Sequence, residues 1–232
     1  MKKPIETPMY FAKGFIEGAE KRFPDVDGDI AKAKRRTTDF LKATGEKIKK
    51  LEEVRKANYA DPTQSDEAKA VNTWEYAKRK HDEVQKLAET LPDLSQFSDG
   101  IQKKINNEMQ QVADSDFGRE ARQRISEMTE KERATFISGR MNNGDYDTPA
   151  FALGAPAYLS GLPDEVHAKF KKKYVSDFYP AESNLMESLN SLHEHTQKGL
   201  KEYNKLMRKL RADASINGAL DKAERAKVLM SK

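Results

Sequence analysis

Residues 181–212 read AESNLMESLNSLHEHTQKGLKEYNKLMRKLRA, and the apolar side chains in this stretch recur every three or four residues. The seam consists of Leu185, Leu189, Leu192, Thr196, Leu200, Tyr203, Met207 and Leu210. Such spacing over about four heptads predicts a long helix that packs along one side, either against the rest of the chain or against another copy. We therefore expect an all-α fold organised by long helices.

The composition agrees with long helices rather than a compact core. Charged residues make up 34% of the 232 residues and aromatic residues 8%, as in helices that bury narrow stripes. The 42 basic and 38 acidic side chains are interspersed and give a net charge of +4, so no global field demands a polyanionic partner. The lack of cysteine excludes disulfides and cysteine-based zinc sites.

A second pattern predicts a long antiparallel helical hairpin, similar to a coiled coil, over residues 25–95. Residues 30–58 carry a heptad seam, residues 66–91 carry a second apolar side, and a proline-containing break separates them. Residues 31–56 hold ten basic and four acidic side chains, whereas 61–95 hold five basic and eight acidic. Opposite charge favours pairing of the two arms with each other.

The arm before this hairpin, residues 1–24, is expected to contain a short helix and to pack on the hairpin. Residues 96–180 are expected to form a bundle of short helices. Those helices are predicted over 100–114, 116–128, 147–154 and 163–178. Thr129 and Glu132 have the spacing of a capping box, and the helix that they open is expected to end at Asn143-Gly144.

The remaining segment, residues 181–232, combines the long helix with a loop and a short exit helix. Residues 213–224 read DASINGALDKAE. The oxygen donors in this loop are Asp213, Ser215, Asn217, Ala219 through its backbone carbonyl, Asp221 and Glu224. Gly218 takes the sixth place, where the backbone turns sharply, and Leu220 is the apolar residue that would fix the loop to a core.

This spacing resembles the calcium loop of the EF-hand family, and the resemblance implies a calcium ion held by those six residues. Only Asp213, Asp221 and Glu224 bring charge, so weak affinity is expected. A single hand would act as a structural clamp on the exit helix or pair across a dimer. The alternative interpretation is an ordinary helix–turn–helix in which Asp213 or Ser215 caps the second helix.

The least polar part of the chain reads APAYLSGLP at residues 155–163. We interpret it as a core, bent by glycine and proline, on which short helices converge. Gly144-Asp145 precedes this segment, and a helix opens after it at 164–167. With these flanks, residues 129–180 are similar to uncharacterised helical proteins encoded by tailed phages and prophages. The resemblance implies a virion-assembly or structural role. It also implies a location in the cytoplasm of a bacterial host or in a virion, and the start of the chain lacks the apolar stretch of a secretory signal peptide.

No motif in the sequence indicates catalysis. His193 and His195 lie two residues apart on a predicted helix and therefore point to different faces, and His81 lies on the hairpin seam and is expected in the core. Phosphate-binding glycine loops, zinc-protease helices and nucleophile elbows are absent. We therefore do not expect an enzyme.

The sequence favours a non-enzymatic helical interaction or assembly protein, such as a component of a phage virion or head, with a calcium-stabilised C-terminus. Its partners would be proteins or further copies of the chain, bound through the helical seams, in an oligomer or larger assembly without a membrane. The first alternative is a nucleic-acid-associated protein that uses the basic arm at 31–56 and the lysines at 169–173. The second is a calcium-responsive regulator that exposes apolar surface when the ion binds.

Overall fold

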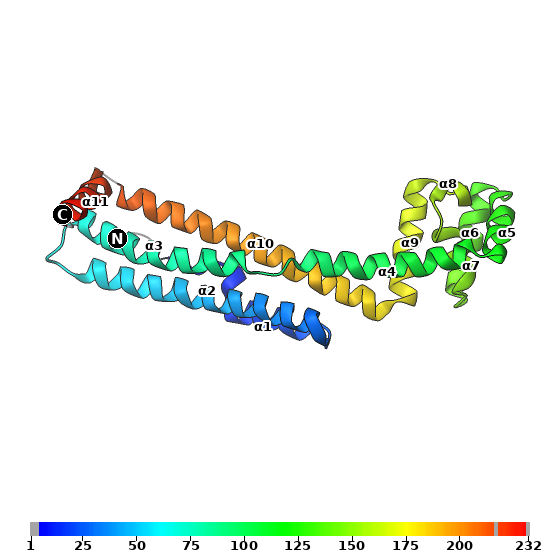
Figure 1. Ribbon diagram of the computed structural model, residues 1–232, viewed down its shortest axis with the longest axis horizontal. Coiled ribbons are helices and arrows are strands. Elements are labelled where there is room, and N and C mark those ends of the chain that lie inside the picture. Colours follow the sequence, from blue (N-terminus) through cyan, green and yellow to red (C-terminus); the bar gives the residue numbers. More distant parts are fainter. Residues whose placement is uncertain (1–4, 216–217, 231–232) are drawn as a thin grey trace. The chain divides into compact units, whose positions relative to one another are not determined.

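The computed structural model describes residues 5–215 and 218–230, and within these ranges every regular element is a helix (Figure 1). The predicted all-α fold is therefore confirmed. The chain divides into two compact units: unit 1 comprises Met1–Leu94 and Ser191–Lys232, and unit 2 comprises Ser95–Asn190. Within the described ranges, none of the helices combines the length and the apolar character that crossing a lipid bilayer requires.

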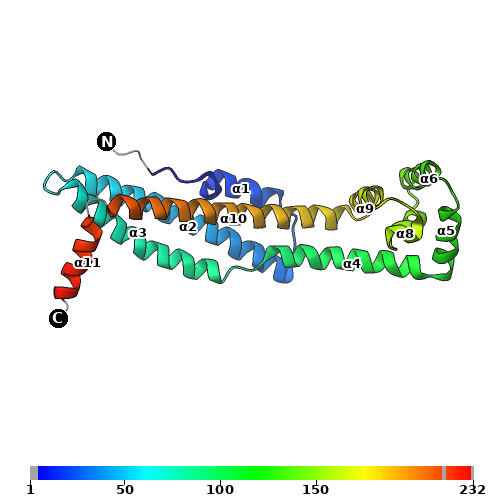
Figure 2. The ribbon, with the colours of Figure 1, turned by 90° about the horizontal axis from the view of Figure 1, so that it is seen from above.

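Unit 1 is built on the predicted hairpin. Its helices are η1 (Met9–Phe11), α1 (Lys13–Arg22), α2 (Gly28–Ala60), α3 (Asp66–Glu89), the second half of α10 (Pro180–Ala214) and α11 (Ala219–Met230). Figures 1 and 2 show α2, α3 and this half of α10 side by side. Asp61 and Ser65 make the turn between α2 and α3, since the Asp61 carboxylate accepts from the Thr63 N–H and the Ser65 hydroxyl accepts from the Ala68 N–H.

Opposite charges meet between the two arms of the hairpin, as the charge pattern predicts. Lys47 on α2 donates to Glu83 on α3 over 2.7 Å, and Lys80 donates to the same carboxylate. These two hydrogen bonds lower the pKa of Glu83 to about 2, the bond from Lys47 having the larger effect.

The N-terminal segment forms a strap, Met9–Arg22, that lies across α2 and α10. Phe11 is 3% exposed, and its ring meets the ring of Tyr203 edge-on at 6.4 Å. The Nε2–H of His195 donates to the Tyr10 carbonyl oxygen over 2.9 Å, and the His195 ring stacks on Phe15 at 4.2 Å. Burial lowers the pKa of His195, which favours the neutral ring in this contact. The arm thus packs on its own hairpin, as expected.

Unit 2 contains the predicted bundle of short helices, packed on one apolar core. Its helices are α4 (Leu94–Asp114), α5 (Asp116–Ser126), α6 (Glu130–Asn142), α7 (Asp147–Leu153), α8 (Ala157–Ser160), α9 (Asp164–Phe178) and the first part of α10. The capping box at Thr129 is formed, and Gly144 has the left-handed φ of +74° expected after the end of a helix. The core includes Ile105, Met109, Ile125, Ile137, Met141, Leu153, Leu162, Tyr174 and Val175.

The apolar segment at 155–163 is only partly core. Ala155, Ala157 and Leu162 are buried, whereas Tyr158 and Leu159 on α8 are 79% and 45% exposed. One turn of helix lies within the segment, and a helical turn directs its side chains to more than one face. Half of the segment therefore adds an apolar surface to unit 2 instead of core.

Candidate functional site

A groove runs between α3 and α10 in unit 1. Two adjoining cavities, with volumes of about 460 Å³ and 370 Å³, share Asn204 and Arg208 and so form one continuous depression. We call it the α3/α10 groove. It is lined by Trp74, Lys78, His81, Asp82, Gln85 and Ala88 of α3, by Gln197, Leu200, Lys201, Asn204, Met207, Arg208 and Arg211 of α10, and by Leu220 of α11.

Helical periodicity places the residues that line this groove on one side of each helix. The lining residues of α3 and of α10 recur every three or four positions, so each set forms a single stripe along its helix. In the middle of the groove the two stripes carry amides instead of leucines, and Gln85 donates to the Asn204 side-chain oxygen over 3.1 Å. The polar bridge ties the helices together but does not fill the space beside it as interdigitated apolar side chains would.

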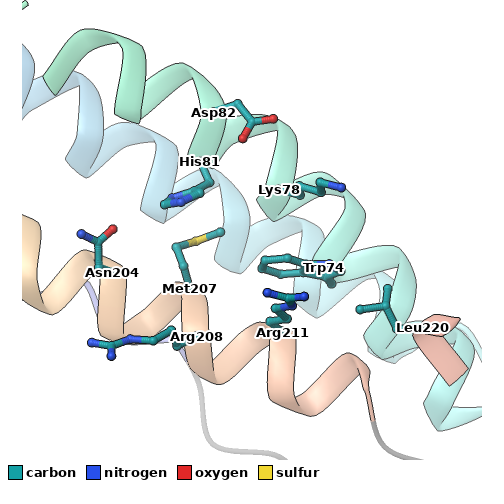
Figure 3. Close-up of a pocket in the computed structure, with 9 residues that line it drawn as sticks. All are labelled: Trp74, Lys78, His81, Asp82, Asn204, Met207, Arg208, Arg211 and Leu220. Atoms are coloured by element: carbon teal, nitrogen blue, oxygen red, sulfur yellow. The ribbon is translucent and has the colours of Figure 1, made fainter. Parts of the chain in front are cut away.

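The floor of the groove is apolar at its α11 end. Trp74, Met207 and Leu220 are all at least nine-tenths buried. Figure 3 shows Trp74 and His81 projecting from α3 toward the side chains of α10. The His81 ring lies 5.7 Å from the Tyr203 ring, and its Nδ1 atom is buried with no hydrogen-bond partner among the described residues. An unpaired buried polar atom is costly, so His81 Nδ1 lowers the stability of the packing beneath the groove.

The rim of the groove is basic. Lys78, Lys201, Arg208 and Arg211 are exposed, and within the part of the chain that the structure describes none of them has a hydrogen-bond or ion-pair partner. The acidic side chain that lines the larger cavity with Lys78, Arg208 and Arg211 is Asp82. Four exposed cations beside one carboxylate give the groove a positive field that attracts anionic groups.

The predicted calcium ligands are distributed over the end of α10 and the start of α11. Asp213 lies in the last turn of α10, and the Ser215 hydroxyl donates to the Arg211 carbonyl oxygen. Asn217 and the side chain of Glu224 lie outside the described residues. Gly218 has φ +68°, the conformation required at the sharp turn of the loop, and Leu220 is buried as expected.

The residue at which the exit helix begins affects whether Ala219 could be a calcium ligand. Helix α11 begins at Ala219, so Ala219 and Asp221 belong to its first turn. The carbonyls of a first turn accept hydrogen bonds from the helix itself. The Ala219 carbonyl would therefore reach a calcium ion only if this turn unwound. Among the side chains that the structure describes, no three of His, Cys, Asp or Glu are grouped so that they could hold a metal ion.

The two basic segments that the sequence suggests for nucleic-acid binding, 31–56 and 169–173, make different contacts in the structure. Most of the cations at 31–56 already contact groups of unit 1. The contacting cations are Lys32, Lys34, Arg35, Arg36, Lys42, Lys47, Arg55 and Lys56. At 169–173, Phe170 packs against the core of unit 2, Lys171 is half-buried, and Lys173 donates to Asn142. Lys49, Lys50, Lys169 and Lys172 are exposed and are not among these contacts.

The predicted positions of His193 and His195 on different faces are confirmed. The Nδ1 atom of His193 lies 3.4 Å from a carboxylate oxygen of Asp93, whereas His195 faces the N-terminal strap. The structure places His81 at the floor of the groove and not in a closed core.

The groove does not follow from the sequence patterns alone. By those patterns His81 and Met207 are seam residues of two separate helices. The available signal is the stripe that Lys201, Arg208 and Arg211 form with Asn204 on one side of α10. No protein family, curated protein or solved structure matches this chain.

Proposed function

We propose that this chain is a non-enzymatic helical protein that binds protein partners in a larger assembly, with the α3/α10 groove as its binding surface. One observation carries the proposal: the groove has an apolar floor and a basic rim. The cations of the rim are exposed and have no hydrogen-bond or ion-pair partner within the described ranges. A surface that combines apolar floor and charged rim has the composition of a protein–protein interface, in which aromatic and arginine side chains are enriched. A place in a phage virion or head is the form of assembly that the sequence resemblance implies.

A photo-reactive amino acid at position 78 tests whether a protein occupies the groove in the cells that produce the chain. We expect covalent adducts with a defined protein, and we expect Arg208→Glu/Arg211→Glu to remove them, because charge reversal on the rim opposes an acidic partner. The matched control places the same group at position 49, an exposed site on α2. Equal labelling at both positions, or none at position 78, would refute the proposal.

The calcium clamp is a second part of the proposal, supported by the sequence spacing, the φ of Gly218 and the burial of Leu220. Calorimetric titration of the wild type should give a heat of binding that Glu224→Gln abolishes or greatly weakens, since the closing carboxylate supplies two ligand oxygens. Light scattering at both end points distinguishes a clamp within one chain, with unchanged mass, from a hand paired across a dimer, with doubled mass. A wild-type chain that takes up no calcium would eliminate the site.

A further inference from the structure

We infer that the α3/α10 groove binds one acidic, amphipathic α-helix of a protein partner. This inference rests on the proposed function and specifies the chemistry of the partner. It is carried by three features of the groove: its length, the order of apolar and polar positions along its floor, and the charge of its rim.

The length of the groove fits a short helix. From Trp74 to Ala88 the α3 side spans about 21 Å at 1.5 Å per residue. The α10 side, from Gln197 to Arg211, spans the same distance. A helix of about 15 residues covers this length, and an amphipathic helix in an apolar groove is a common mode of recognition between proteins.

The floor specifies where the apolar side chains of the partner must lie. One end presents Trp74, Met207 and Leu220, and the other presents Ala88 and Leu200. Between these ends, the Gln85–Asn204 hydrogen bond crosses the floor. A matching helix therefore needs an apolar side chain near each end of its inner face and a polar one between them.

The rim specifies the charge of the partner. Lys201, Arg208 and Arg211 lie along the α10 wall, and Lys78 faces them from α3. Glutamates or aspartates on the two flanks of the partner helix would pair with these cations, which have no partner in the described ranges. Nucleic acid fits less well, because phosphates would not cover the apolar floor of Met207, Leu200 and Leu220.

The sole tryptophan of the chain, Trp74, reports occupancy of the groove directly. The probe is a tryptophan-free amphipathic peptide of about 15 residues, with leucines toward both ends of one face, a threonine between them and glutamates on the flanks. We expect saturable binding that changes Trp74 emission. We also expect that a scrambled peptide of equal composition, the same peptide with lysine in place of glutamate, and a single-stranded oligonucleotide all bind more weakly.

A pair of charge-reversal variants with the same net charge locates the binding. Arg208→Glu/Arg211→Glu should weaken peptide binding by about tenfold or more, since both changes fall on the rim. Lys49→Glu/Lys50→Glu, at two exposed lysines of α2 outside the groove, should change it by less than about twofold. Equal binding of the scrambled peptide, equal effects of both variants or stronger binding of the oligonucleotide would overturn the inference. If position 78 cross-links to a protein in cells while the peptide fails to bind, only the helical partner is rejected and the proposed function stands.

Discussion

Replacement of Phe11 by alanine should lower the free energy of unfolding of unit 1 by about 3–5 kcal/mol, the usual range for removing a fully buried phenylalanine ring. Phe11 contacts two glycines that make room for the strap. A Cβ atom at Gly45 of α2 would lie 2.5 Å from the Phe11 carbonyl oxygen, and one at Gly199 of α10 would lie 3.1 Å from the Phe11 ring. The Phe11 backbone therefore packs on α2 and its ring packs on Gly199 and Tyr203 of α10, and alanine would leave a cavity beside α10.

Chemical denaturation followed by Trp74 fluorescence measures this effect in unit 1, since the only tryptophan of the chain lies in α3. Met9→Ala is the matched control, because Met9 lies in the same η1 turn and is 58% exposed. Its effect should stay within about 0.5 kcal/mol. If the two variants unfolded at the same denaturant concentration, the Phe11 ring would contribute nothing to the packing of the strap on α10.

Local patterns predict the elements that local chemistry determines. The hairpin follows from two apolar stripes and a proline-containing turn. The observed α2 covers the predicted stretch 30–58, and α3 begins at the predicted residue 66 and ends two residues before the predicted residue 91. Helix α7 begins at Asp147 as predicted and ends at Leu153, one residue before the predicted end, and the Thr129 capping box is formed. In each case the side chains that decide the structure lie within a few residues of one another in the sequence.

Features that depend on contacts between distant residues are not predictable in this way. Helix α4 begins at Leu94 and not at the predicted residue 100, and Leu94 and Ser98 in its additional first turns are both buried. Arg122 is 7% exposed and donates to the carbonyl oxygens of Ala113 and Phe151. A buried arginine that caps the end of another helix has no signature within its own helix.

The groove escapes prediction for the same reason. The seams of α3 and α10 each read as complete stripes, and the sequence leaves open whether they pack within the chain or between copies. Only the pairing of the two helices shows that Gln85 meets Asn204 and that the cations of α10 lie beside Trp74 of α3. A site that two helices form together can be recognised only when the relative position of the helices is known.

Gly154→Ala should destabilise unit 2 by about 1–3 kcal/mol or more, as overpacking of a tight contact does. A Cβ atom at Gly154 would lie 2.6 Å from the carbonyl carbon of Met109 and 2.8 Å from the carbonyl oxygen of Ala150. Both are backbone atoms of helices, so no flexible side chain can move aside. The new methyl group would push the end of α7 away from α4, and the buried residues Met109 and Leu153 would lose their close packing.

Hydrogen exchange resolves this effect by unit, because peptides from α4 and α7 report unit 2 while peptides from α2 and α3 provide an internal reference in unit 1. Gly139→Ala is the control. Gly139 lies within α6, and among the described residues no neighbouring group lies within 4 Å of the place that an added methyl group would take, so alanine there should stabilise by about 0.5–1 kcal/mol. Faster exchange in α4 and α7 for Gly154→Ala alone would show that the close approach of these helices holds unit 2 together. Unchanged exchange would mean that α7 can shift away from α4 without a measurable loss of stability. The packing at Gly154 would then not fix the position of α8 and of the apolar surface that it presents.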